Sequence, residues 1–208
     1  MSTGTRLTPT SYAILGLLAV RSWSSYELTR QMERGLGRFW PRAVSKLYEE
    51  PKKLVAQGLA TAANPPPATR RRTVYTITAA GRACLAAWMA QPAQNPVLES
   101  EQLLRIFFAE NGTKTDLLTV IASMRTWAAD QRTVNATIAR SYLNNEAAFP
   151  ERLAHTMLVG RFLADFEDMV TNWTEWADTL VSKWPSDIAD AEADRHTLGY
   201  LAHRDHRT

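Results

Sequence analysis

Short amphipathic stretches with clear ends make up the first 92 residues. Apolar side chains recur at helical spacing in four of them, whereas residues 73–78 form the β-branched and aromatic run that is typical of a strand. Thr8 and Pro9 form a good cap and first turn for the first helix, and Gly58 stops the third. We therefore predict four helices over residues 10–20, 25–36, 42–57 and 79–89, with two strands, 59–62 and 73–78, between the third and the fourth.

Three helices followed by a β-hairpin are the arrangement of a winged helix-turn-helix domain. The second helix is expected to bury Tyr26, Leu28 and Met32. Helices and strands alternate too briefly for a doubly wound α/β sheet. The predicted fold class is therefore mainly α, with a winged helix-turn-helix over residues 1–92 that consists of three helices, a β-hairpin wing and a fourth helix.

The second half of the chain has helical periodicity throughout. Proline residues and the pairs Asn-Gly and Asn-Asn separate its segments. We predict helices over residues 98–110, 116–142 and 151–184. Residues 97–185 are accordingly assigned to one all-α domain, and residues 186–208 to a polar, loosely held C-terminal tail.

The last of these helices carries a seam of large apolar residues. They follow one another at steps of three or four, close to a heptad repeat, and they are Leu158, Phe162, Phe166, Met169, Trp173, Trp176 and Leu180. Three helices alone bury little, and this seam is too rich in aromatic residues for one surface of a small domain. We therefore predict a homodimer whose interface runs along the seam from Phe162 to Leu180; a self-contained bundle is the alternative.

The two halves differ in charge. Residues 1–92 hold 13 lysines and arginines against 4 acidic residues, a net charge of +9, whereas residues 93–208 hold 11 against 17, a net charge of −6. This separation indicates a polyanionic partner, such as nucleic acid, for the first half. Chance surface composition is the alternative explanation.

Basic and hydrogen-bonding residues concentrate on two elements of the first half. Recognition helices read bases from their N-terminal turns, and the arginines at the wing tip can enter the minor groove or clamp phosphates. The predicted contacts with DNA are Arg42, Ser45, Lys46, Tyr48, Lys52, Lys53, Arg70, Arg71 and Arg72. Taken alone, each stretch could also be a solvated basic face.

Three patches of the first 90 residues resemble the PadR family of bacterial regulators, in family order and at family spacing. They are YAILGLL (12–18) with SYEL (25–28); SKLY (45–48) with Leu54 and GL (58–59); and YTITAAGR (75–82) with Leu85 and Trp88. The second half is similar to the long C-terminal helical domain of the family's larger subgroup, which dimerises by exchanging helices. The resemblance implies a repressor, often released by a small aromatic or drug-like effector.

Pro51 departs from the family pattern, which usually has an aliphatic residue at this position. Proline removes the hydrogen bond to the Leu47 carbonyl and disfavours helical geometry at Glu50, at a cost of about 3 kcal/mol in an ideal helix. We expect a kink or a break in the third helix there. Such a break would change how Arg42 and Lys46 are aimed.

Tryptophans of the second half are candidates for an effector pocket. Trp127, Trp173 and Trp176 could line an aromatic cavity at the dimer interface, although such a stripe is more often interface core. The single cysteine, Cys84, is expected to be a small buried residue rather than a redox sensor. The histidines of the tail lack a fixed geometry, so we predict no metal site and no cofactor.

Several function classes are disfavoured. The sequence contains no nucleophile elbow, no glycine-rich phosphate loop and no paired zinc-ligand motif, so an enzyme is not expected. It has neither an apolar run of about 18 residues nor an export signal, and we expect a cytoplasmic protein without a membrane span.

These features together predict a homodimeric repressor that binds a pseudo-palindromic operator in double-stranded DNA. One alternative is an adapter whose winged helix contacts protein and not DNA; it would have no need of a charge of +9 on one half. Another is a ligand-binding sensor that acts without DNA, for which substitutions at Arg42 and Lys46 would be silent.

Overall fold

The computed structural model describes residues 6–63 and 72–203. The chain divides into two compact units, residues 1–96 and residues 97–208, which we call the first and the second unit. Within the described ranges, no helix is both long enough and apolar enough to cross a membrane.

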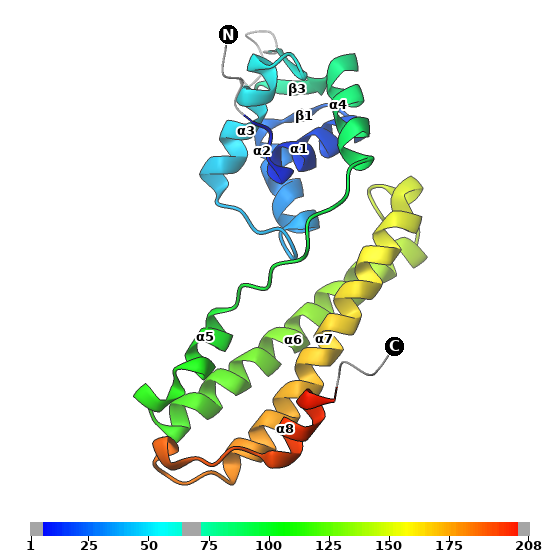
Figure 1. Cartoon of the computed structure of the whole chain (residues 1–208). Helices are drawn as coiled ribbons and strands as arrows, with labels where there is room; N and C mark the ends of the chain where they lie inside the picture. The colour runs from blue at the N-terminus through cyan, green and yellow to red at the C-terminus, as the bar shows by residue number, and fades with distance from the viewer. Residues whose placement is uncertain (1–5, 64–71, 204–208) are drawn as a thin grey trace. The chain divides into compact units, whose positions relative to one another are not determined.

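The first unit combines a group of helices with a small antiparallel sheet (Figure 1). In chain order its elements are α1 (Pro9–Val20), β1 (Trp23–Ser24), α2 (Ser25–Gln31), a π-helical turn (Met32–Leu36), α3 (Val44–Ala56), β2 (Ala60–Ala63), β3 (Val74–Ile77) and α4 (Ala79–Met89). The strand order is β1-β3-β2, so the return strand of the wing lies in the middle. The predicted winged helix-turn-helix is confirmed. The strand β1 was not predicted, because two residues are too few to produce a periodic signal.

The helices begin where the capping chemistry of the sequence places them. The Thr8 hydroxyl accepts a hydrogen bond from the backbone N–H of Ser11, while Ser11 Oγ accepts one from the N–H of Thr8. Ser24 and Glu27 form the same reciprocal pair at the start of α2, and Thr78 caps α4. Each of these bonds satisfies a backbone N–H that a helix start would otherwise leave open.

The core of the first unit forms where α1 packs against α3, α4 and β3. Ile14, Leu15 and Leu18 of α1 are almost completely enclosed, as are Leu28 of α2 and Leu54 of α3. Burial of each such side chain is worth about 1.5–3 kcal/mol. The first unit therefore has a well-packed core of its own.

One residue of α2 is placed differently from the prediction. Leu28 and Met32 are buried as expected, but Tyr26 is 47% exposed. Leu28 and Met32 are four positions apart and share one face of the helix, whereas a residue two positions before Leu28 lies on nearly the opposite face. The predicted burial of Tyr26 was therefore wrong.

Of the kink or break predicted at Pro51, the break does not occur, because α3 runs through this residue as one helix; the kink stays a prediction. The proline ring is fully buried, and this burial offsets part of the cost of the lost backbone bond. The preceding residue, Glu50, is also buried, and its carboxylate accepts a hydrogen bond of 2.7 Å from Ser11 Oγ in α1. Packing and this tertiary bond together hold the backbone helical.

The second unit is all helical, and its two longest helices lie side by side (Figure 1). Its elements are α5 (Glu101–Phe107), a 3₁₀ turn (Ala109–Asn111), α6 (Lys114–Leu143), a 3₁₀ turn (Pro150–Arg152), α7 (Leu153–Ser182), a 3₁₀ turn (Ile188–Asp190) and α8 (Arg195–Ala202). Lys114 Nζ donates to the carbonyl oxygens of Ser182 and Trp184, which joins the start of α6 to the end of α7. The two helices are therefore antiparallel. The predicted loose tail also contains structure, because α8 lies within it and Asp194 caps it.

The contact between α6 and α7 follows a heptad-like seam of its own, distinct from the aromatic seam predicted for the dimer interface. The residues of α7 that are buried follow one another at steps of four and three, and they are Leu163, Glu167, Val170, Thr174, Ala177 and Val181. Each lies one position after a member of the aromatic seam that the sequence analysis singled out. The aromatic seam therefore occupies the adjacent face of α7, about 100° around the helix.

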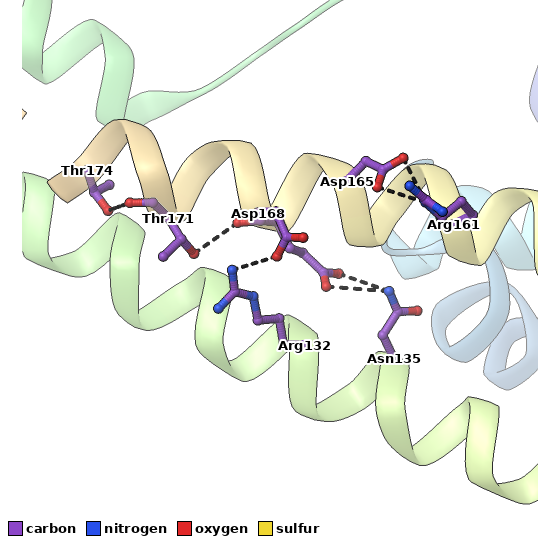
Figure 2. Close-up of polar contacts among 8 residues, drawn as sticks. Arg132, Asn135, Arg161, Asp165, Asp168, Thr171 and Thr174 are labelled. Carbon is purple, nitrogen blue, oxygen red and sulfur yellow. Dashed lines mark hydrogen bonds and ion pairs between the residues drawn. The ribbon is translucent and has the colours of Figure 1, made fainter. Parts of the chain in front are cut away.

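A polar layer interrupts the α6–α7 seam at its second residue on α7, and Figure 2 shows Arg132 and Asn135 of α6 beside it. Glu167 is only 2% exposed, and Asn135 Nδ2 lies 3.4 Å from each of its carboxylate oxygens. Beside this layer, Arg132 of α6 forms an exposed ion pair of 2.6 Å with Asp168 of α7. Because both pairs join α6 to α7, they favour one register of the two helices.

Candidate nucleic-acid interface

The N-terminal turns of α3 present a row of polar side chains to solvent. Leu47 points into the core and is 2% exposed, whereas its neighbours on both sides are exposed. The exposed residues include four of the predicted DNA contacts, namely Arg42, Ser45, Lys46 and Tyr48. The structure therefore brings them together on the open side of one helix start, where backbone N–H groups and the helix dipole also favour an anion.

Arg42 is held in position before α3 begins. Its guanidinium lies 4.0 Å from the centre of the Trp40 ring, within the range of a cation–π contact. Trp40 Nε1 in turn donates a 3.2 Å hydrogen bond to the hydroxyl of Thr10 in α1. Arg42 thus rests on a side chain that is anchored to another helix, which restricts its freedom before any partner binds.

Two of the three predicted lysine contacts of α3, Lys52 and Lys53, are not equivalent. Lys53 Nζ lies 2.9 Å from the Glu50 carboxylate, and this hydrogen bond is the main reason why the pKa of Lys53 is raised. Lys52 is also exposed, on the neighbouring position. Lys53 must release or share Glu50 before it can contact a phosphate, so its contribution to binding is expected to be the smaller.

The wing arginines are only partly within the described residues. Arg70 and Arg71 lie outside them, and Arg72 is exposed at the start of the return strand. The Arg72 guanidinium lies 5.6 Å from the centre of the Tyr26 ring. The structure thus joins the wing to α2, a link that the sequence analysis missed because it placed Tyr26 in the core.

The residues predicted to form a dimer interface are largely accessible in the single chain. Phe162, Met169 and Trp176 are 69%, 49% and 43% exposed, and Phe166, Trp173 and Leu180 are half-buried. Phe166 also makes an edge-to-face contact with Trp127 of α6, at 5.9 Å between ring centres. Together these residues form an apolar face that spans both long helices.

The tryptophans predicted to line an effector pocket are partly open to solvent in the single chain. Trp127 and Trp176 are partly exposed, and the Trp173 and Trp176 rings lie 6.1 Å apart. A hollow of about 440 Å³ lies elsewhere, between α5 and α6. A pocket at the tryptophans remains a prediction that needs a second subunit to complete it.

Two family models match the chain. Residues 14–87 match the Transcriptional regulator PadR-like family, and residues 99–182 match the Virulence activator alpha C-term family. The negative transcriptional regulator PadR of Bacillus subtilis (strain 168) is 33% identical over 99 residues, which are 47% of this chain and 54% of that protein. The chain thus spans about half the length of this curated relative.

Solved structures share the fold over most of the chain. Bacillus subtilis PadR in complex with operator DNA has a TM-score of 0.70 at 23% identity and covers 85% of this chain and 99% of its own. The same protein in complex with p-coumaric acid has a TM-score of 0.64 at 23% identity, covering 83% and 98%. The Vibrio cholerae virulence activator AphA has a TM-score of 0.61 at 23% identity, covering 84% and 96%.

Proposed function

Because the chain belongs to the PadR-like family of transcriptional regulators, which are not enzymes, we propose that it is a homodimeric repressor that binds operator DNA. The first unit is the DNA-binding part in this proposal, and the second unit makes the dimer. Two copies related by a two-fold axis would read a pseudo-palindromic site.

The observation that carries the proposal is the start of α3. Arg42, Ser45 and Lys46 are exposed together at the start of a helix whose opposite face is packed into the core of a winged helix-turn-helix. A helix start of this kind fits the major groove and can reach base edges with arginine and lysine. The excess of basic residues in the first half supplies the attraction for phosphates.

The dimer is proposed from the apolar face of the second unit. Phe162, Met169 and Trp176 are exposed there, and exposed aromatic residues in such a row are typical of a surface that another chain covers. The polar flank of the same helix pair, which carries the Arg132–Asp168 ion pair, needs no such cover.

The proposal also includes a small-molecule effector. One related structure contains p-coumaric acid, and this chain has Trp127, Trp173 and Trp176 on the face where two subunits would meet. A flat aromatic molecule could stack on these rings and change how the two subunits are arranged. Such a molecule would release the protein from DNA if it bound the free form better than the bound form.

Selection from random duplexes followed by affinity measurements would test the DNA-binding part. We expect the selected sites to share a two-fold symmetric consensus. The logarithm of the binding constant should fall linearly with the logarithm of the salt concentration, with a slope of about −0.9 per phosphate contact. Lys46→Ala should weaken binding to the selected site by about 1–3 kcal/mol and relax the preference at particular base pairs. Lys183→Ala removes the same charge from an exposed position of the second unit and serves as the control.

Two outcomes would contradict the proposal. If the wild-type protein bound no duplex even at low salt, DNA binding itself would be excluded. If Lys46→Ala and Lys183→Ala had equal effects, α3 would not be the reading helix.

A further inference from the structure

Tyr26 lies between two arginines that come from different parts of the first unit. Arg30, one turn further along α2, has its guanidinium 5.6 Å from the centre of the Tyr26 ring and donates a 3.1 Å hydrogen bond to the Tyr26 hydroxyl. Arg72, at the base of the wing, lies 5.6 Å from the same ring. Both distances are within the range of cation–π attraction. One exposed aromatic ring therefore gathers two guanidinium groups.

The cluster sits where α2 is fastened to the wing. The backbone N–H of Ser25 donates to the carbonyl of Thr73, and Ser24 pairs with Val74 across the sheet. Main-chain hydrogen bonds thus fix Ser25 at the start of α2 and Thr73 directly before the return strand. Tyr26 and Arg72 follow and precede these fixed positions directly, so the two elements cannot separate without breaking the sheet.

The cluster keeps an excess of positive charge. Glu27 is the acidic residue of this part of α2, and its carboxylate is occupied as a cap. It accepts hydrogen bonds from the N–H and the hydroxyl of Ser24, which are the main reasons why the pKa of Glu27 is lowered. Arg21 also approaches it at 3.9 Å. The charges of Arg21 and Arg72 both act on this one carboxylate, while Arg30 lies against the Tyr26 hydroxyl.

Two guanidinium groups with a surplus of charge beside one exposed ring are suited to an anion with several oxygens. Arginine presents a planar set of donors that matches phosphate, and stacking on a ring leaves the edge of that plane open. Resting on Tyr26 also reduces the rotamer freedom that each arginine would lose on binding.

We propose that Arg30 and Arg72 form a second phosphate clamp on the DNA backbone, with Tyr26 as the residue that positions both arginines. The inference rests on the proposed DNA-binding function and adds Tyr26 and Arg30 to the residues expected from the sequence. The clamp links the wing to α2 on the backbone, while α3 reads the bases. It carries no base preference of its own.

The first test compares alanine variants of three arginines of the first unit. Arg30→Ala and Arg72→Ala should each weaken selected and scrambled duplexes about equally and make the salt slope shallower by about one unit. Arg34→Ala is the matched control, because Arg34 is an exposed arginine one turn beyond Arg30 in the same helical stretch. If Arg34→Ala had the same effect as Arg30→Ala, or if Arg30→Ala changed base preference, the clamp would be excluded.

The second test asks whether Tyr26 acts through the arginines. Tyr26→Phe keeps the ring and removes only the hydroxyl, so it should retain most of the affinity. Tyr26→Leu removes the ring and should weaken binding, but only while the arginines are present. In a protein that already carries Arg30→Ala and Arg72→Ala, Tyr26→Leu should have little further effect. An equal loss in both backgrounds would show that Tyr26 has a merely structural role and would overturn its assignment as a positioning residue.

The outcomes separate this inference from the proposed function. If the wild-type protein bound duplexes with a steep salt dependence while the Tyr26, Arg30 and Arg72 variants all behaved like Arg34→Ala, the clamp would fail and DNA binding would stand. If the wild-type protein bound no duplex, the proposed function would fail together with the clamp. Thermal melting of each variant identifies any that do not fold. For these, Arg30→Lys and Arg72→Lys, which keep the charge but lose the planar donors, replace the alanine variants. The salt slope should then stay the same while affinity falls, and unchanged affinity in both lysine variants would exclude the clamp.

Discussion

The two units of this chain bury apolar residues to very different degrees. The largest fully buried side chains are mostly in the first unit, namely Ile14, Leu15, Leu18, Leu28, Met32, Pro51 and Leu54. In the second unit the corresponding residues are Ile121, Glu167 and Thr174, of which two are polar. The second unit also exposes most of the large apolar side chains, including Phe107, Leu158 and Phe162. One copy of the first unit thus buries more large apolar side chains than one copy of the second unit does.

The difference indicates how function is divided between the units. A domain whose core is complete can present charged side chains on a rigid frame, as α3 and the wing do here. A helix pair that leaves aromatic residues in solvent gains stability when another chain covers them. We infer that the second unit is built for association and the first for recognition, and each prediction below tests one side of this comparison.

The largest effect is expected at the apolar face of the second unit. Phe162→Glu combined with Trp176→Glu places two charges where the proposed dimer buries aromatic rings, and burial of an unpaired charge is strongly unfavourable. Sedimentation should show a monomer for this variant and a dimer for the wild type. Thr179→Glu adds a charge at an exposed position of the same helix and should leave the dimer intact. A double variant that stayed dimeric would place the interface elsewhere.

The next effect concerns the core of the first unit. Leu28 is completely buried, so Leu28→Ala should reduce the free energy of unfolding by about 2–5 kcal/mol, measured by denaturant titration. Leu104, on α5 of the second unit, is 61% exposed, and Leu104→Ala should change stability by about 0.5 kcal/mol or less in a single chain. If Leu104→Ala reduced the free energy of unfolding more at high protein concentration than at low, a partner subunit would cover α5 as well.

The sequence predicted the helices well because periodicity and caps are local signals. Thr8, Ser24 and Thr78 each occupy a helix start, and their hydroxyls cap it as their positions indicate. The face of α7 that packs on α6 could not be chosen in the same way. Two sets of residues, one position apart, both follow a heptad repeat, and the set that packs within the chain contains polar members such as Glu167 and Thr174.

The candidate site was predicted only in part, for a related reason. The polar row at the start of α3 is continuous in sequence, so it was found together with its helix. The contact of Tyr26 with Arg72 joins residues of two elements, and no spacing rule connects positions so far apart. The same holds for the bond from Ser11 to Glu50, which keeps α3 intact at Pro51 and made the expected break wrong.

A smaller effect is expected in the polar layer between α6 and α7. Asn135→Ala removes a donor that faces the buried Glu167 carboxylate and should reduce the free energy of unfolding by about 1–3 kcal/mol. Denaturant titration would measure this loss, and Asn172→Ala, at an exposed position of α7, is the control. Equal stability of the two variants would mean that the layer adds nothing to the pairing of these helices.

The smallest effect separates two helix caps of the first unit. Ser24→Ala and Thr78→Ala should each reduce the free energy of unfolding by about 1 kcal/mol at neutral pH. Each removes a hydroxyl that accepts a hydrogen bond from a backbone N–H. Of the two residues, Ser24 also donates to the Glu27 carboxylate. Its backbone N–H and, second, its hydroxyl lower the pKa of Glu27 in the folded state, and Ser24→Ala removes the hydroxyl part. A lowered pKa stabilises the fold above the unfolded pKa, and this contribution is lost as the pH falls through the folded pKa. The cost of Ser24→Ala should therefore shrink between about pH 7 and about pH 3, while the cost of Thr78→Ala stays constant. Urea titrations of both variants at the two pH values would measure this, and equal pH dependence would show that Glu27 does not contribute through its charge.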